Sequence, residues 1–235
     1  MTPADVPGRT YRQSRFAPPP GAVEFLLIRH GESQPLRPGE AFPLVDGQGD
    51  PELAPEGRDQ AERVCRRLSG EHIDAIYVST LRRTLQTAEP LARELGLKPH
   101  VDAALREVHL GSWEGGLFRV KVAEGDPVAQ RLFREERWDV IPGAEGAAAL
   151  AERVRSVITR LAAAHAGRRL AVFTHGGFIA QALALASGSR PFAFLGADNA
   201  SVSHLVVIGD QWVVRRYNDT AHLDGALARS SAPLT

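Results

Sequence analysis

The sequence predicts an α/β fold with a mostly parallel central sheet, and two observations carry this prediction. Three apolar runs have the length and composition of buried strands, and stretches with helical periodicity separate them. Each run also stops abruptly at polar or charged residues that precede a loop or a helix. This alternation favours an α/β sheet over an all-β or an all-α fold.

The three predicted strands occupy residues 23–28, 73–79 and 168–175. Between the first two strands, apolar side chains recur at i, i+3, i+4 and i+7 and therefore share one face of a helix: Ala61, Val64, Cys65 and Leu68. Because Cys65 belongs to this face, we interpret it as a core residue rather than as a reactive thiol.

Three more helices and a hairpin are predicted along the rest of the chain. One helix follows Ser79 and contains Pro90, which should bend it or divide it in two. Another covers about residues 145–164, and the last follows His175 in the stretch GFIAQALALA. Near the end of the chain, HLVVIGDQWVVRRY predicts a β-hairpin that turns around Gly209.

Two segments show no clear periodicity and are predicted to be long loops or lids near a binding site. Residues 34–57 are rich in glycine and proline, and residues 116–146 form an excursion between predicted helices. We expect one domain over residues 21–223, preceded by a flexible lead at 1–20 and followed by a frayed tail at 224–235.

The composition excludes several classes of function. The 235 residues carry a formal net charge of zero, so we expect no nucleic-acid partner. We also expect no membrane association, because no apolar run is long enough to span a bilayer and the first residues lack the apolar stretch of a secretory signal. The single cysteine cannot form an internal disulfide, which favours a cytoplasmic location. The oligomeric state is left open, a homodimer included.

Side chains that bind anions follow all three predicted strands. Arg29 and His30 follow the first, Arg82 and Arg83 the second, and His175 the third. If these strands are parallel neighbours, the side chains converge at the carboxyl edge of the sheet, where ligands bind in such folds. A pocket with guanidinium and imidazole groups suits a phosphate, and histidine can also act as a nucleophile.

The motifs around these residues resemble those of the histidine phosphatase superfamily, also called the phosphoglycerate mutase-like family. LLIRHGES, STLRRTLQTA, LREVHLGSWEG and VFTHGG resemble its four conserved boxes, and DPELAPEGRDQA resembles the segment that opens its first helix. The matches follow the expected order from about residue 25 to residue 220. The resemblance implies a three-layer α/β/α sandwich of the phosphoglycerate mutase-like kind.

The resemblance also implies a role for each residue in the motifs. His30 would be the nucleophile that becomes phosphorylated, and Glu107 would be the proton donor. Arg29, Arg83 and His175 would bind the phosphoryl group. The expected activity is a metal-independent phosphomonoesterase that hydrolyses small phosphorylated substrates through phosphohistidine and needs no cofactor.

Departures from the family pattern bear on which reaction to expect. Pro35 and Leu36 stand where the mutase members have tryptophan and asparagine, and the segment between Glu107 and His175 is short beside that of the mutases. Both points favour a phosphatase. A phosphoglycerate mutase-type phosphotransferase and a non-catalytic phospholigand-binding protein remain alternatives. Gly176 replaces the aspartate of the acid-phosphatase branch, which leaves the acid role to Glu107.

Several residues keep two interpretations. Glu114 is a rival acid, and Arg82 is expected to be a solvated helix residue. Four aromatic residues either cover the substrate or pack in the core: Trp113, Phe118, Phe133 and Trp138. Five basic residues of the excursion either bind an acidic substrate or form a solvated face: Arg119, Lys121, Arg131, Arg134 and Arg137.

A metal site is the rival use of the same side chains. His30, His175 and Glu107 would form a set of two histidines and one carboxylate, which is a known arrangement of metal ligands. The nearby arginines argue against it, because guanidinium groups repel a cation.

Overall fold

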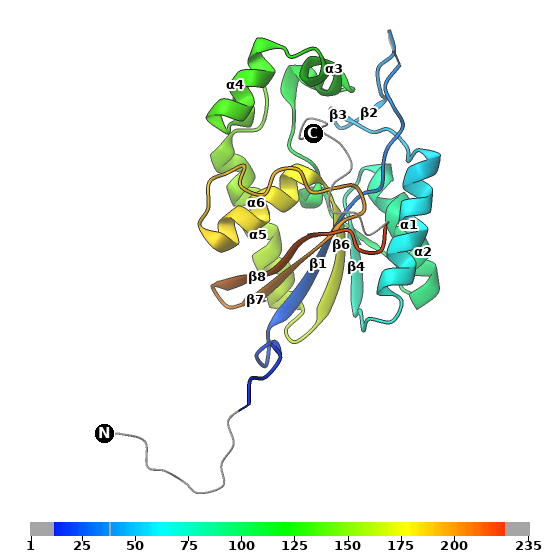
Figure 1. Ribbon diagram of the computed structural model, residues 1–235, viewed down its shortest axis with the longest axis vertical. Helices are drawn as coiled ribbons and strands as arrows, with labels where there is room; N and C mark the ends of the chain where they lie inside the picture. The colour runs from blue at the N-terminus through cyan, green and yellow to red at the C-terminus, as the bar shows by residue number, and fades with distance from the viewer. Residues whose placement is uncertain (1–11, 38, 224–235) are drawn as a thin grey trace, which may run out of the picture.

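The computed structural model describes residues 12–37 and 39–223 and shows three layers (Figure 1). The central sheet has six strands in the order β5-β4-β6-β1-β7-β8. Their bounds are β1 (Val23–Arg29), β4 (Ala75–Val78), β5 (His100–Val101), β6 (Arg169–Thr174), β7 (Val202–Ile208) and β8 (Gln211–Asp219). The pairs β5–β4, β4–β6 and β6–β1 are parallel, whereas β7 pairs antiparallel with β1 and β8 antiparallel with β7. The predicted, mostly parallel sheet is confirmed.

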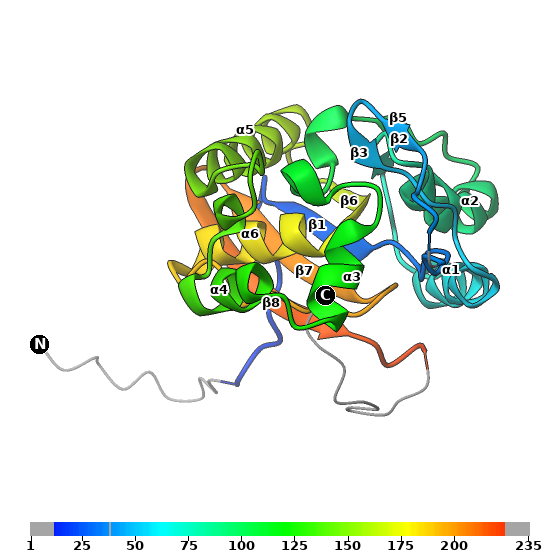
Figure 2. The same ribbon diagram turned by 90° about the horizontal axis from the view of Figure 1, so that it is seen from above.

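Alternate residues of β1 face opposite helical layers. Phe25 and Leu27 pack with the buried faces of α5 (Ala147–Ala164) and α6 (Gly176–Ser187). Leu26 and Ile28 pack in the second core, which includes buried residues of α1 (Pro55–Leu68) and α2 (Arg82–Leu95). Because the sheet is buried on both faces, its central strands are apolar throughout, which explains the continuous apolar runs in the sequence. The α/β/α sandwich is therefore confirmed (Figure 2).

The predicted hairpin is also confirmed, and of the two effects expected of Pro90 the division of its helix does not occur. Ile208 pairs with Gln211 across a two-residue turn, in which Gly209 adopts a positive φ of 54°. By contrast, α2 continues through Pro90 and is not divided. Pro90 is buried on this helix, so packing against its surroundings outweighs the loss of one backbone hydrogen bond.

The two segments predicted as loops contain regular structure. Within residues 34–57 lie the short strands β2 (Leu44–Val45) and β3 (Gln48–Gly49), and α1 begins at Pro55. Within residues 116–146 lie α3 (Leu117–Ala123), α4 (Pro127–Glu135) and the 3₁₀ turn η3 (Trp138–Val140). Helices of two turns are too short for their periodicity to stand out in a sequence, which explains why the sequence indicated only an excursion of weak periodicity here.

These insertions lie beyond the carboxyl ends of β1, β4 and β6, where Figure 1 shows α3, α4, β2 and β3 at the top of the molecule. Two further 3₁₀ turns, η1 (Ala103–Leu105) and η2 (Gly111–Trp113), precede α3. Residues 12–20 form no helix or strand, and the predicted frayed tail lies outside the described residues. Within the described ranges, no helix combines the length and the apolar character that crossing a bilayer requires.

Candidate active site

The register of two parallel strands places the two predicted histidines side by side. Arg29 at the end of β1 pairs with Thr174 at the end of β6, and the next residues of these chains are His30 and His175. The backbone N–H of His30 donates to the carbonyl of Thr174 at 3.0 Å. The two imidazole centroids are 5.1 Å apart with an interplanar angle of 61°.

The hydrogen bond of His30 determines which ring nitrogen is available for chemistry. Nδ1 lies 2.7 Å from the carbonyl oxygen of Gly31, and a carbonyl only accepts, so Nδ1 carries the proton. Nε2 then keeps its lone pair. Burial, followed by the charges of Arg83 and Arg29, holds the pKa of His30 well below its usual value. The buried imidazole is therefore neutral at pH 7.

His175 lies next to His30 and is fully buried. Its Nε2 is 2.9 Å from the hydroxyl of Ser79, which follows β4, so the polar ends of two neighbouring strands meet. Burial and the charge of Arg83 hold the pKa of His175 well below its usual value. The buried Nδ1 of His175 has no hydrogen-bond partner within the described residues.

Two guanidinium groups, Arg29 at the end of β1 and Arg83 in the first turn of α2, lie at the same cavity as His30. Arg29 donates from Nη1 to the carbonyl of Ala197 at 2.5 Å, and Arg83 donates from Nη1 to the carbonyl of Gly49 at 2.9 Å. Burial lowers the pKa of both, that of Arg83 to about 10. Both groups therefore remain positively charged at neutral pH.

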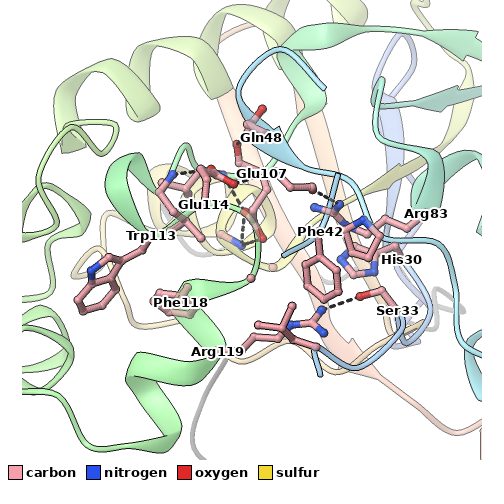
Figure 3. Close-up of a pocket in the computed structure, with 18 of the residues that line it drawn as sticks. His30, Ser33, Phe42, Gln48, Arg83, Glu107, Trp113, Glu114, Phe118 and Arg119 are labelled. Atoms are coloured by element: carbon pink, nitrogen blue, oxygen red, sulfur yellow. Dashed lines mark hydrogen bonds between the residues drawn. The ribbon is translucent and has the colours of Figure 1, made fainter. Parts of the chain in front are cut away.

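Glu107 and Glu114 also line this cavity, but their oxygens differ in availability (Figure 3). Glu114 accepts backbone N–H groups on both oxygens, from Leu110 and from Gly49, each at 2.8 Å. Glu107 accepts from Val108 and Gly177 on Oε1, at 2.9 and 3.0 Å, whereas Oε2 has only a longer contact of 3.3 Å with Gly177. Glu107 thus keeps the oxygen that is more available to a ligand.

Gly177 packs so closely against Glu107 that no larger residue would fit at this position. A Cβ at this position would lie 2.6 Å from Oε1 of Glu107 and 2.6 Å from a methyl group of Val108. The absence of a side chain lets the first turn of α6 approach the carboxyl group closely enough for the backbone hydrogen bond.

Arg82 is a partly exposed helix residue, as the sequence suggested, but it also forms ion pairs that the sequence did not indicate. Its backbone N–H and Nε both donate to Asp50, each at 2.8 Å, and Nη1 donates to Glu52 at 3.2 Å. Asp50 is buried, with 3% of its surface exposed. The pair therefore anchors the segment containing β2 and β3 to the first residue of α2.

Residues next to Asp50 were missed by sequence reasoning although they touch the predicted site. The side-chain amide of Gln48 donates to the backbone carbonyl of Glu107 at 2.9 Å. Gly49 accepts from Arg83 and donates to Glu114. No motif or periodicity marks these positions, because their contacts depend on how the insertion folds back over the sheet.

Among the basic residues of the 116–146 excursion, Arg119 lines the cavity. Its guanidinium donates to the hydroxyl of Ser33 at 2.6 Å and to the carbonyl of Gln34 at 2.9 Å, and it lies 5.1 Å from the centroid of the Phe42 ring. Burial of the guanidinium and the charge of Arg29 lower its pKa. The other four form ion pairs with acidic side chains: Lys121–Asp126, Arg131–Glu135, Arg134–Glu135 and Arg137–Asp139.

The cavity has a volume of about 560 Å³ and combines these polar groups with apolar walls. Trp113, Phe118 and Trp138 belong to its lining, whereas Phe133 packs against the main hydrophobic core. No group of three or more histidine, cysteine, aspartate or glutamate side chains in the described part of the chain is placed to hold a metal ion.

Comparison with known proteins points to one family. A model of the histidine phosphatase superfamily, branch 1, matches residues 25–220. Phosphoglycerate mutase-like protein 4 from Arabidopsis thaliana is 35% identical over 209 residues, which cover 86% of this chain and 87% of that protein. Phosphoserine phosphatase 1 from Hydrogenobacter thermophilus is 31% identical over 207 residues, which cover 86% of this chain and 94% of that protein.

A solved structure extends the likeness to the fold. The mycobacterial glucosyl-3-phosphoglycerate phosphatase superposes with a TM-score of 0.71 at 29% identity, covering 85% of this chain and all of that one. The resemblance drawn from the motifs, including the fold it implied, is confirmed.

Proposed function

Because this chain is an enzyme of the histidine phosphatase superfamily, we propose that it hydrolyses phosphate monoesters through a phosphohistidine formed on His30. The observation that carries this proposal is the state of that imidazole. It is neutral, its Nδ1 proton is bound to the carbonyl of Gly31, and its Nε2 lone pair is left at a cavity lined by two guanidinium groups. A neutral imidazole with a fixed tautomer is a competent nucleophile.

The charges around His30 suit the group it would attack. Phosphate monoesters are among the least reactive biological esters, and their hydrolysis needs accelerations of up to about 10²¹-fold. Arg29 and Arg83 supply two fixed positive charges, and the N-terminus of α6 adds backbone N–H groups. The buried Nδ1 of His175 still lacks a partner, which an oxygen of the phosphoryl group would provide.

Glu107 would complete both halves of the reaction. In the first half, Nε2 of His30 bonds to phosphorus, the P–O ester bond breaks, and the protonated carboxyl group of Glu107 gives its proton to the departing oxygen. In the second half, water attacks phosphorus, its proton passes to the Glu107 carboxylate, and the P–N bond breaks to release phosphate. The negative charge of a bound phosphate favours the protonated carboxyl group that the first half requires.

The relatives indicate the kind of substrate. Two are phosphatases of phosphoserine and of glucosyl-3-phosphoglycerate, which are both phosphate monoesters of small metabolites. The proposed reaction uses no metal or cofactor, since the arginines supply the positive charge. The single cysteine favours a reducing, cytoplasmic location for this activity.

A mutase is the second candidate, because another relative is named as phosphoglycerate mutase-like. A mutase has to retain its phosphorylated intermediate and return the phosphoryl group to a second hydroxyl. Leu36, which lines the cavity, offers no hydrogen bond that would help to retain it. This observation favours transfer to water.

The test is to follow release of phosphate from p-nitrophenyl phosphate by the wild-type enzyme and by His30→Ala and Glu107→Gln. We expect His30→Ala to abolish turnover and an acid-labile phosphoenzyme to be trapped on wild-type protein only. Turnover by His30→Ala at the wild-type rate would exclude the mechanism. Phosphate binding without any turnover would indicate a non-catalytic protein, and transfer between the hydroxyls of phosphoglycerate would indicate a mutase.

A further inference from the structure

The cavity is much larger than a phosphoryl group needs. Its volume of about 560 Å³ falls in the range of roughly 300–1,000 Å³ that is typical of sites for drug-sized ligands. The anion-binding groups Arg29, His30 and Arg83 occupy only part of its wall. The remaining space is therefore available to the alcohol part of the ester.

Most of that remaining wall is apolar. We call it the apolar chamber and define it by six lining residues: Leu36, Phe42, Trp113, Phe118, Trp138 and Leu195. The ring centroid of Phe118 lies 6.2 Å from that of Trp113 and 6.0 Å from that of Trp138. Phe118 therefore packs between two tryptophans that are mostly buried, and the three rings together give the cavity an aromatic wall that favours apolar or flat groups.

Three of the polar side chains that line the cavity already bind the protein backbone, while Glu32, Ser33 and Arg119 also belong to its wall. Gln48 donates to the carbonyl of Glu107, and both carboxylate oxygens of Glu114 accept backbone N–H groups. Asn199 donates to the carbonyl of His30 at 3.0 Å. A leaving alcohol rich in hydroxyl groups would compete with these bonds, and a polar group left unsatisfied on burial is unfavourable.

The chamber is also held in a fixed shape before substrate binds. Arg119 joins α3 to the segment that follows His30 and lies over the ring of Phe42. Gly116 packs so closely that a Cβ there would lie 2.9 Å from the same ring. A preformed wall loses little conformational entropy when it binds a ligand.

We propose that the enzyme acts preferentially on phosphate esters of alcohols with a bulky apolar or aromatic body, which the apolar chamber binds. This inference rests on the proposed phosphatase function and adds the class of leaving group. Phosphoserine and other small polar esters would present the same phosphoryl group but leave the chamber without a complementary surface.

The experiment compares esters of primary alcohols, because their leaving groups need similar help from an acid and differ mainly in size. The wild-type enzyme is assayed for phosphate release from ethyl, butyl and hexyl phosphate, 2-(1-naphthyl)ethyl phosphate and phosphoserine. We expect kcat/KM to rise about fourfold for each added methylene group that the chamber buries. We expect the naphthyl ester to exceed both ethyl phosphate and phosphoserine by at least about tenfold.

Two matched variants then locate the effect. Phe118→Ala removes a ring from the chamber, and Phe133→Ala removes one from α4 in the same excursion, outside the cavity lining. Phe118→Ala should lower the ratio of kcat/KM for the naphthyl ester to kcat/KM for ethyl phosphate about tenfold. Phe133→Ala should leave the ratio of the two esters unchanged, whatever it does to thermal stability.

The outcomes separate this inference from the proposed function. A flat alkyl series, or a preference for phosphoserine, would overturn the chamber as the site of an apolar leaving group while the phosphatase activity stands. If none of the esters is hydrolysed in a reaction that depends on His30, the proposed function itself fails. The alkyl series uses only wild-type protein, so the result does not depend on how well either variant folds.

Discussion

The contact between Gly177 and Glu107 gives the sharpest test of the proposed acid, because a single methyl group would disturb it. Gly177 lies in the first turn of α6 with ordinary helical backbone angles, so alanine causes no strain in the main chain. Alanine also has the higher helix propensity, by up to about 1 kcal/mol. We therefore expect Gly177→Ala to fold, with the new Cβ displacing both the carboxyl group of Glu107 and the buried methyl group of Val108.

The size of the displacement follows from the geometry. The added Cβ would lie 2.6 Å from Oε1 of Glu107, whereas ordinary van der Waals contact begins at 3.4 Å. The carboxyl group has to withdraw by the difference, about 0.8 Å, and it also loses its backbone hydrogen bond to Gly177. Misplacing a catalytic group by about 1 Å costs on the order of 100-fold in rate.

The assay compares two esters that depend differently on an acid. Ethyl phosphate has a basic leaving group that needs a proton as the ester bond breaks, whereas p-nitrophenolate leaves almost unaided. For Gly177→Ala we expect kcat/KM to fall by on the order of 100-fold with ethyl phosphate and less than about fivefold with p-nitrophenyl phosphate. Glu107→Gln should show the same contrast.

The neighbouring glycine is the control. A Cβ on Gly176 would lie 3.5 Å from Nε of Arg29, which is ordinary contact, so Gly176→Ala should change kcat/KM by less than about threefold. Equal losses in the two alanine variants would mean that the effect belongs to the helix terminus as a whole. Equal losses with the two esters would refute Glu107 as the proton donor.

Three further predictions concern the protonation of His30, the ion pair of Asp50 and the role of Arg119 in substrate binding. At pH 7, nuclear magnetic resonance should find a proton on Nδ1 of His30 and none on Nε2. In a pH titration the imidazole should become charged only well below pH 6.5, because burial and two guanidinium groups lower its pKa. Since the unfolded histidine takes up a proton near pH 6.5 and the folded one does not, its contribution to the free energy of unfolding is complete above pH 6.5 and declines as the pH falls below it. Asp50→Ala should reduce the free energy of unfolding by about 1–3 kcal/mol, because Asp50 is buried and binds both the backbone and the side chain of Arg82. The control is Asp59→Ala at an exposed ion pair, which should reduce the free energy of unfolding by less than about 0.5 kcal/mol. Chemical denaturation of both variants measures the difference. Arg119→Ala should raise KM for phosphate esters about tenfold. Arg119→Lys should raise it less, because lysine keeps the charge but loses the two directed hydrogen bonds. Identical kinetics in the wild type and both variants would contradict this prediction.

The meeting of the two histidines could be predicted because strand order and register determine it. His30 and His175 are far apart in the chain, but each follows a strand, and those strands are parallel neighbours whose last residues pair. A strand that is apolar on both faces and stops at a polar residue leaves a clear signal in the sequence. The same signal marks Ser79, which the structure joins to His175.

The walls of the site could not be predicted in the same way. Arg119 and Phe118 lie on α3, a helix of seven residues that is too short to display an apolar face. Gln48 and Asp50 lie in and beside a hairpin of two-residue strands, where side-chain alternation carries no information. The ion pairs of Arg82 were missed for the same reason, since its partner Asp50 belongs to a segment whose path depends on tertiary contacts.

This difference has a functional consequence. The groups proposed to act on phosphorus sit at strand and helix ends of the central sandwich, where packing on both faces of the sheet holds them. The apolar chamber is drawn largely from the connecting segments, although Trp113 and Trp138 also belong to the main hydrophobic core. Substitutions in α3 should therefore alter which alcohol is accepted while the transfer of the phosphoryl group to His30 persists. A protein built in this way can keep one reaction and change its substrate through residues 34–57 and 116–146. This explains why the sequence motifs indicate a phosphoryl group but do not indicate which alcohol carries it.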